Sequence, residues 1–182
     1  MIYSSVDPED FPIVGDFVLF QNFESDSLAL IHKVIERRTL LKRKGAGKKV
    51  EYQPIAANVD IGIIMQGLDN DFNINRLERY LVMLEQFKIS PVILFSKSDL
   101  ISPEELRSLK DDLSKRFPNI EMIFFSNFEK ESITEIISLL IPGKTFCLIG
   151  SSGVGKSTLI NNLIGEEVSS TQEVRENDSK GR

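Results

Sequence analysis

One short segment constrains the fold of this chain more than any other feature. Residues 150–157, GSSGVGKS, match the pattern G-x-x-x-x-G-K-[ST] at every fixed position. Such a loop binds phosphates because its glycines let the backbone approach anionic oxygens and the following helix presents its positive end. The loop needs a strand before it and a helix after it, and the apolar run 145–149 and the helical pattern 156–164 supply both. The segment therefore predicts a nucleoside phosphate site in an α/β fold.

The phosphate loop, residues 150–158, supplies the first candidate binding residues. Lys156 is expected to reach the β- and γ-phosphates as a point charge, and Ser157 is expected to offer its hydroxyl to Mg²⁺. The expected phosphate contacts are Gly150, Ser151, Ser152, Gly153, Val154, Gly155, Lys156, Ser157 and Thr158. A strand-to-helix turn that binds nothing is the alternative, and the flanking strand and helix argue against it.

From about residue 58, apolar runs alternate with helical patterns. The runs, each typical of a strand buried on both faces, are residues 59–65, 91–95, 120–125 and 145–149. Apolar residues at helical spacing lie between them, and capping boxes are expected at Ser102 with Glu105 and at Ser132 with Glu135. This alternation predicts a parallel sheet covered by helices.

The first 57 residues follow a different pattern. Turn residues and alternating apolar positions predict short strands at 17–20, 28–35 and 39–41, with no helical period. A small β-barrel is the expected arrangement of these strands.

A second motif, SKSD at residues 96–99, follows the apolar run 91–95. Open α/β sheets bind ligands at the carboxyl ends of their strands. The Asp99 carboxylate can accept two hydrogen bonds from the N1–H and 2-amino groups of guanine, a donor pair that adenine lacks. Lys97 can lay its aliphatic stem along the base. On its own such a pattern is more often a solvated turn, and the phosphate loop in the same sheet favours base recognition.

This base motif resembles the N-K-x-D element of GTPases, with Ser96 where asparagine is usual. We expect the shorter serine not to span to the neighbouring loop. Ser126 and Asn127, after the run 120–125, resemble by position the S-A element whose backbone N–H contacts the guanine oxygen. Asparagine stands there in place of alanine, and a simple strand-end turn explains the pair equally well.

The order of these motifs is unusual. In ordinary GTPases the phosphate loop comes first, whereas here Asp99 precedes Gly150. A fold keeps its site when its ends are joined and the chain is reopened elsewhere. The order therefore implies a circularly permuted GTPase domain.

Three further segments narrow this interpretation. They are QPIAANVD at residues 53–60, DFN at 71–73 and RLERYL at 76–81. With them, roughly residues 12–182 resemble the ribosome small-subunit-dependent GTPase A family, also called RsgA or YjeQ. The resemblance implies an OB-type barrel, a permuted GTPase domain and a zinc-binding domain. It also implies GTP hydrolysis, stimulated by the small ribosomal subunit, during late maturation of that subunit.

The same resemblance shows what this sequence lacks. The family's zinc-binding domain and its D-x-P-G element are absent, and the chain stops at Arg182. Its N-terminal segment is short, as if the first strands of the barrel were missing. We expect a truncated member that binds GTP or GDP with Mg²⁺ but hydrolyses GTP poorly, and we assign no catalytic residue. The expected parts are an incomplete OB-like β domain at 1–57, an incomplete permuted GTPase domain at 58–168 and a polar, disordered switch-region tail at 169–182.

Basic residues cluster in a chain whose net charge is −5. They are Arg37, Arg38, Lys42, Arg43, Lys44, Lys48 and Lys49. The net charge argues against wholesale nucleic-acid coating, but a local basic strand and loop on an OB-type barrel can follow a phosphate backbone. We therefore expect contact with ribosomal RNA here. A solvated basic hairpin is the alternative.

The remaining composition limits other functions. One cysteine, Cys147, and one histidine, His32, cannot form a disulfide or build a zinc site. No secretion signal or membrane-length apolar run is present, so we expect a cytoplasmic monomer whose partners are GTP or GDP and the small ribosomal subunit with its rRNA. Two alternatives stay open. One is a non-catalytic rRNA-binding module that has lost nucleotide function. The other is a P-loop ATPase of another class, which would need a Walker-B acid on a strand after the phosphate loop, and the sequence shows no such strand.

Overall fold

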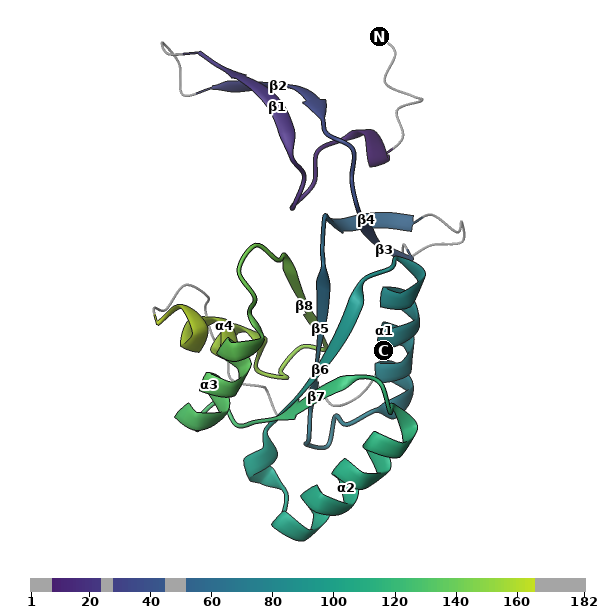
Figure 1. Ribbon diagram of the computed structural model, residues 1–182, viewed down its shortest axis with the longest axis vertical. Coiled ribbons are helices and arrows are strands. Elements are labelled where there is room, and N and C mark those ends of the chain that lie inside the picture. Colours follow the sequence, from purple (N-terminus) through teal and green to yellow (C-terminus); the bar gives the residue numbers. More distant parts are fainter. Residues whose placement is uncertain (1–7, 24–27, 45–51, 166–182) are drawn as a thin grey trace.

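A computed structural model describes residues 8–23, 28–44 and 52–165 of the chain. Two parts lie along the long axis of the molecule, an N-terminal β part at one end and an α/β part below it (Figure 1). The expected switch-region tail, residues 169–182, lies outside the described residues. No helix within the described ranges combines the length and apolar character that a membrane crossing requires.

The α/β part is built on one sheet with the strand order β7-β6-β5-β8, in which every neighbouring pair is parallel. Its strands are β5 (Ile61–Gly67), β6 (Ser90–Ser96), β7 (Glu121–Phe124) and β8 (Phe146–Gly150). Each begins within two residues of the apolar run that predicted it. The phosphate loop follows β8 and the base motif follows β6, so both lie at the carboxyl edge of the sheet, as the permuted GTPase interpretation requires.

Helices cover both faces of this sheet (Figure 1). They are α1 (Ile74–Gln86), α2 (Pro103–Arg116), α3 (Lys130–Leu139) and α4 (Lys156–Ile164). On one face Leu77 of α1 and Leu113 of α2 pack with Ile64 and Phe95 of the sheet. On the opposite face, residues of α3 and α4 pack with Met65 and other sheet residues. Strand residues that alternate in direction thus feed two separate cores, which explains why the strands are apolar along their whole length.

The helix starts bear out one of the two expected capping boxes. At α2 the Ser102 hydroxyl accepts from the Glu105 N–H at 3.3 Å, and the Glu105 carboxylate accepts from the Ser102 N–H at 3.0 Å. The box expected at Ser132 and Glu135 is wrong. A turn closed by Glu129 N–H and the Ser126 carbonyl, 3.2 Å apart, starts α3 at Lys130, so Ser132 lies inside the helix and its hydroxyl bonds Glu129 at 3.0 Å.

The N-terminal part contains two separate antiparallel pairs, β1 with β2 and β3 with β4. The strands are β1 (Val18–Asn22), β2 (Ala29–Val34), β3 (Leu40–Lys44) and β4 (Tyr52–Ala57). These small sheets are consistent with the expected partial barrel. Strand β4 was not predicted because Pro54 interrupts its pattern. The pairing accommodates this proline through a register shift beside Lys42.

Asn58 joins the two parts. Its backbone has a φ of 55°, its side chain is buried, and its Oδ1 accepts from Arg38 N–H at 2.9 Å. Its Nδ2 donates to the Gly15 carbonyl, also at 2.9 Å. Asparagine tolerates this left-handed backbone better than most residues. Asn58 therefore allows the chain to bend between β4 and β5, and its side-chain hydrogen bonds stabilise that bend.

Candidate nucleotide site

The phosphate loop has the backbone that a phosphate cradle needs. A Cβ at Gly150 would collide with the Met65 carbonyl oxygen, and Gly155 has a φ of +92° with its Cβ position 2.6 Å from Asn127 Nδ2. Neither position accepts a larger residue without strain. Val154 is buried against the core and anchors the middle of the loop. The loop therefore runs tightly into the positive N-terminal end of α4, where anions bind well.

Lys156, the first residue of α4, contacts the loop through its side chain. Its ammonium donates to the carbonyls of Gly150 and Ser151 at 3.1 and 2.7 Å. Burial lowers the pKa of Lys156, because a desolvated ammonium is less stable than a solvated one. An anionic phosphate in this place would stabilise the charged form.

The base motif is tied directly to the phosphate loop. Ser96 is fully buried, and its hydroxyl donates to the Val154 carbonyl at 2.7 Å. The expectation that a serine is too short to span to the neighbouring loop is therefore wrong. The parallel strands bring the two loops within reach of a short side chain, because β6 and β8 flank the same strand β5.

Lys97 and Asp99 occupy the turn beyond β6. Lys97 has a left-handed backbone with a φ of 63°, and its ammonium pairs with Asp69 at 2.5 Å. Asp99 lies in the short 3-10 helix η2 (Ser98–Leu100), where its side chain is exposed. An exposed carboxylate at this edge is accessible to a base. The Ser98 N–H donates to the Phe125 carbonyl at 3.2 Å, so this turn is held to the end of β7.

Ser126 and Asn127 follow β7. Ser126 is fully buried, and its hydroxyl accepts from the Phe128 N–H at 3.3 Å. Asn127 Nδ2 donates to the Gly155 carbonyl at 3.3 Å, and the Asn127 carbonyl accepts from Asn162 Nδ2 at 2.9 Å. Asn127 Oδ1 is buried, and none of the described residues gives it a hydrogen bond. The three motifs predicted from the sequence thus converge on one edge of the sheet.

A contact that the sequence reasoning missed joins the β5–α1 loop to this site. The Ser151 hydroxyl donates to Asp71 Oδ2 at 2.7 Å, and Arg76 binds both oxygens of the same carboxylate, at 3.1 and 2.7 Å. Neither Asp69 nor Asp71 was assigned a role at this site from the sequence. The available signal was their position at a ligand-binding strand end, just before Arg76 in the first turn of α1.

The donor set fits a magnesium nucleotide. Ser157 and Thr158 lie half-buried in the first turn of α4, next to Lys156. No group of three or more His, Cys, Asp or Glu side chains within the described ranges could hold a metal by itself. Mg²⁺ in nucleotide sites needs no such group, since it takes phosphate oxygens, waters and one or two protein oxygens. Ser157 is the residue that would hold it.

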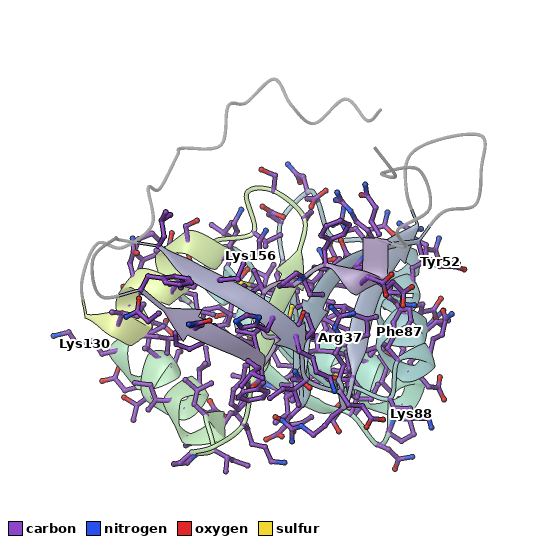
Figure 2. All side chains as sticks on the ribbon, turned by 90° about the horizontal axis from the view of Figure 1, so that it is seen from above. Arg37, Tyr52, Phe87, Lys88, Lys130 and Lys156 are labelled. Carbon is purple, nitrogen blue, oxygen red and sulfur yellow. The ribbon has the colours of Figure 1, made fainter. Side chains whose placement is uncertain are left out.

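Some basic residues of the N-terminal part are held in contacts within the fold, and others are exposed. Arg37 bonds both oxygens of Asp16 at 2.7 Å and the carbonyls of Glu9 and Phe11 at 2.6 and 2.9 Å, which assigns its guanidinium to the fold (Figure 2). Lys42 pairs with Glu9. Arg38 and Arg43 are exposed.

Only the main chain of Lys44 is described, and Lys48 and Lys49 lie outside the described residues. His32 is exposed beside Gln21, at 3.2 Å, and Cys147 is half-buried in β8, where burial raises the pKa of its thiol. Neither residue lies with the three motifs.

Comparison with known proteins identifies the family. A model of the family described as RsgA GTPase matches residues 34–182. This chain belongs to the RsgA GTPase family. The chain also resembles two solved structures. These are YjeQ from Thermotoga maritima (TM-score 0.66, 26% identity, 85% of this chain and 52% of that one) and YloQ, described as a circularly permuted GTPase (TM-score 0.63, 26% identity, 88% and 51%).

Curated relatives agree. Small ribosomal subunit biogenesis GTPase RsgA 2 of Vibrio parahaemolyticus is 40% identical over 169 residues, which are 93% of this chain and 45% of that protein. Small ribosomal subunit biogenesis GTPase RsgA of Methanosarcina acetivorans is 40% identical over 172 residues, covering 94% and 46%. The chain thus spans about half the length of these RsgA relatives.

Proposed function

We propose that this chain binds guanine nucleotides with Mg²⁺ and that it serves as an RsgA-type GTPase in late maturation of the small ribosomal subunit. One observation carries the nucleotide proposal, the hydrogen bond from Ser96 to the Val154 carbonyl. It fixes the base motif to the phosphate loop, so that a single nucleotide can contact both. Membership of the RsgA family and the names of the relatives support the ribosomal role.

Each residue has a definite task in this proposal. Backbone N–H groups of residues 150–155 and the ammonium of Lys156 bind the phosphates, while the Ser157 hydroxyl holds Mg²⁺. The Asp99 carboxylate accepts the N1–H and 2-amino hydrogens of guanine, and the stem of Lys97 lies along the base. The main chain near Asn127 contacts the guanine oxygen.

Competition binding tests the nucleotide proposal. A fluorescent GDP analogue with Mg²⁺ should bind and be displaced by GTP and GDP, but not by ATP at the same concentration. Asp99→Asn should shift preference from guanosine to xanthosine diphosphate by at least about tenfold, since an amide can donate to the second carbonyl of xanthine. Equal displacement by ATP would contradict the guanine assignment.

The proposed rRNA contact uses the exposed cations of the N-terminal part. Arg38→Ala with Arg43→Ala should weaken binding to small subunits and flatten its salt dependence, because fewer counterions are released. Lys156→Ala separates the two activities. Lost nucleotide binding with retained subunit binding is expected, whereas a wild-type chain that binds subunits but no nucleotide would favour the non-catalytic rRNA-binding alternative.

A further inference from the structure

The β5–α1 loop, residues 68–73, contacts both halves of the candidate nucleotide site. The Asp71 carboxylate accepts from the Ser151 hydroxyl of the phosphate loop at 2.7 Å. The Asp69 carboxylate pairs with the Lys97 ammonium of the base motif at 2.5 Å. Its other oxygen accepts from the Asp71 N–H at 3.2 Å. One loop therefore links two motifs that lie more than fifty residues apart in the sequence.

Asp71 is held rigidly for a half-exposed side chain. Arg76 binds both its carboxylate oxygens, and the buried Gln66 donates to its carbonyl at 3.2 Å. Burial alone would raise the pKa of Asp71, but the hydrogen bonds from Arg76 and Ser151 and the charges of Arg76 and Lys97 lower it, so the carboxylate stays ionised. Arg76 also neutralises a negative charge that would otherwise repel a phosphate bound nearby.

Asp69 constrains Lys97 in a comparable way. Because the ammonium pairs with Asp69, fewer rotamers are available to the four-carbon stem of Lys97. A side chain that is ordered before the ligand arrives loses less conformational entropy on binding. The Lys97 backbone is also restricted, with its φ of 63°.

We propose that Asp69 and Asp71 are positioning residues that act on different halves of the nucleotide. Asp69 orders Lys97 beside the base, and Asp71 holds Ser151 and so preorganises the phosphate loop. The inference rests on the proposed guanine-nucleotide binding and adds to it a division of labour within a single loop. Neither carboxylate needs to touch the nucleotide.

Affinities for two ligands separate these roles. Competition against a fluorescent GDP analogue gives dissociation constants for GDP, which has base and phosphates, and for guanosine, which has no phosphate. Asp71→Ala should weaken GDP by about tenfold and leave guanosine within about twofold, since only the phosphate contacts depend on Ser151. Asp69→Ala should weaken both ligands by the same factor, about three- to tenfold, since both present the base to Lys97.

Ser151→Ala tests the Ser151–Asp71 hydrogen bond from its other partner. It removes the donor without changing the loop that carries Asp71, so it keeps the test available if Asp71→Ala fails to fold. It should reproduce the effect of Asp71→Ala on GDP, and the double variant should be no weaker than either single variant. Asp71→Asn keeps an acceptor for the hydroxyl and should recover most of the GDP affinity.

Glu78→Ala is the matched control. It removes an α1 carboxylate that pairs with Arg116 at 2.7 Å, and it should change neither affinity. An Asp71→Ala variant that weakens GDP and guanosine equally, or that changes neither, would overturn the inference, as would additive effects of Asp71→Ala and Ser151→Ala. A folded wild-type chain that binds no guanine nucleotide would instead overturn the proposed function on which the inference rests.

Discussion

Leu77 and Leu30 are both leucines in regular secondary structure, but their exposure to solvent differs. Leu77 of α1 has no exposed surface, whereas Leu30 of β2 is 51% exposed. The contrast extends to their surroundings. Strand β6 is buried along nearly its whole length, while β1 and β2 are exposed at most positions, including Leu19 and Phe20. The α/β part is thus stabilised mainly by apolar burial, and so are Leu41 of β3 and Ala56 of β4, which belong to one of its cores, whereas the β1–β2 pair is not.

Polar contacts instead hold the segments on either side of the β1–β2 pair. Asp16 and Arg37 form an ion pair whose side chains are only 1% and 13% exposed, and Asn58 bonds both Gly15 and Arg38. These contacts are directional and few, whereas a core is made of many small contacts. Two regions of one chain are therefore held by different kinds of interaction.

The largest expected effect separates the two parts. Leu77→Ala should lower the free energy of unfolding by about 3 kcal/mol, because it deletes buried methyl groups and leaves a cavity. Leu30→Ala should lower it by less than about 0.5 kcal/mol, since its side chain is already half in water. Urea titration followed by circular dichroism measures both. Equal losses would mean that the β1–β2 pair is packed in solution.

Arg37→Met tests the Asp16–Arg37 ion pair, the polar anchor of the N-terminal part. It should lower the free energy of unfolding by about 2 kcal/mol, since it leaves the buried Asp16 carboxylate without its charged donor. The same urea titration measures this change. Arg43→Met, on an exposed side chain bonded only to Gln53 among the described residues, at 3.2 Å, is the control and should stay within about 0.5 kcal/mol. An Arg37 variant as stable as this control would mean that the ion pair does not hold the N-terminal part.

Acid should weaken the same anchor. The hydrogen bond from Arg37 is the main reason that the pKa of Asp16 lies below its ordinary value, although burial opposes it. A lowered folded-state pKa contributes stability above the unfolded pKa, near 4, and this contribution is lost as pH falls through the folded pKa. Unfolding free energies measured from pH 6 down to pH 3 should therefore fall less steeply in Arg37→Met than in the wild type. If the free energy of unfolding fell equally steeply with pH in both proteins, Asp16 would not be the group whose protonation weakens the anchor.

The elements predicted well from the sequence are those that burial or a strong local signal decides. Helix α4 has the predicted bounds, because Gly165 ends it with a φ of 75°. Strand β6 extends only one residue beyond its apolar run at each end. Strand β4 was missed because its pairing accommodates Pro54 through a register shift, which depends on its partner strand.

At the candidate nucleotide site, too, the features that were missed depend on residues far away in the sequence. Its phosphate loop is a local motif, and the strand and helix on either side of it lie where the sequence predicts them. The Ser96–Val154 and Asp71–Ser151 contacts join residues 58 and 80 positions apart, and only the sheet order brings them together. Reading such contacts from sequence requires the arrangement of the strands, and also the distance between loops at the edge of the sheet.

Ser102→Ala should have a smaller effect than Leu77→Ala or Arg37→Met, and it tests the same comparison within the α/β part. Like Arg37, Ser102 is a polar anchor, but it lies on the surface of the α/β part, where water can replace the lost hydrogen bond. Removing an N-cap hydroxyl typically costs about 1 kcal/mol, so the loss should fall below that of Arg37→Met. Ser132→Ala, inside α3 rather than at its cap, should cost less still. If thermal and urea unfolding instead gave Ser102→Ala the larger effect, burial would not be what sets the strength of a polar contact in this molecule, and the contrast between its two parts would need another cause.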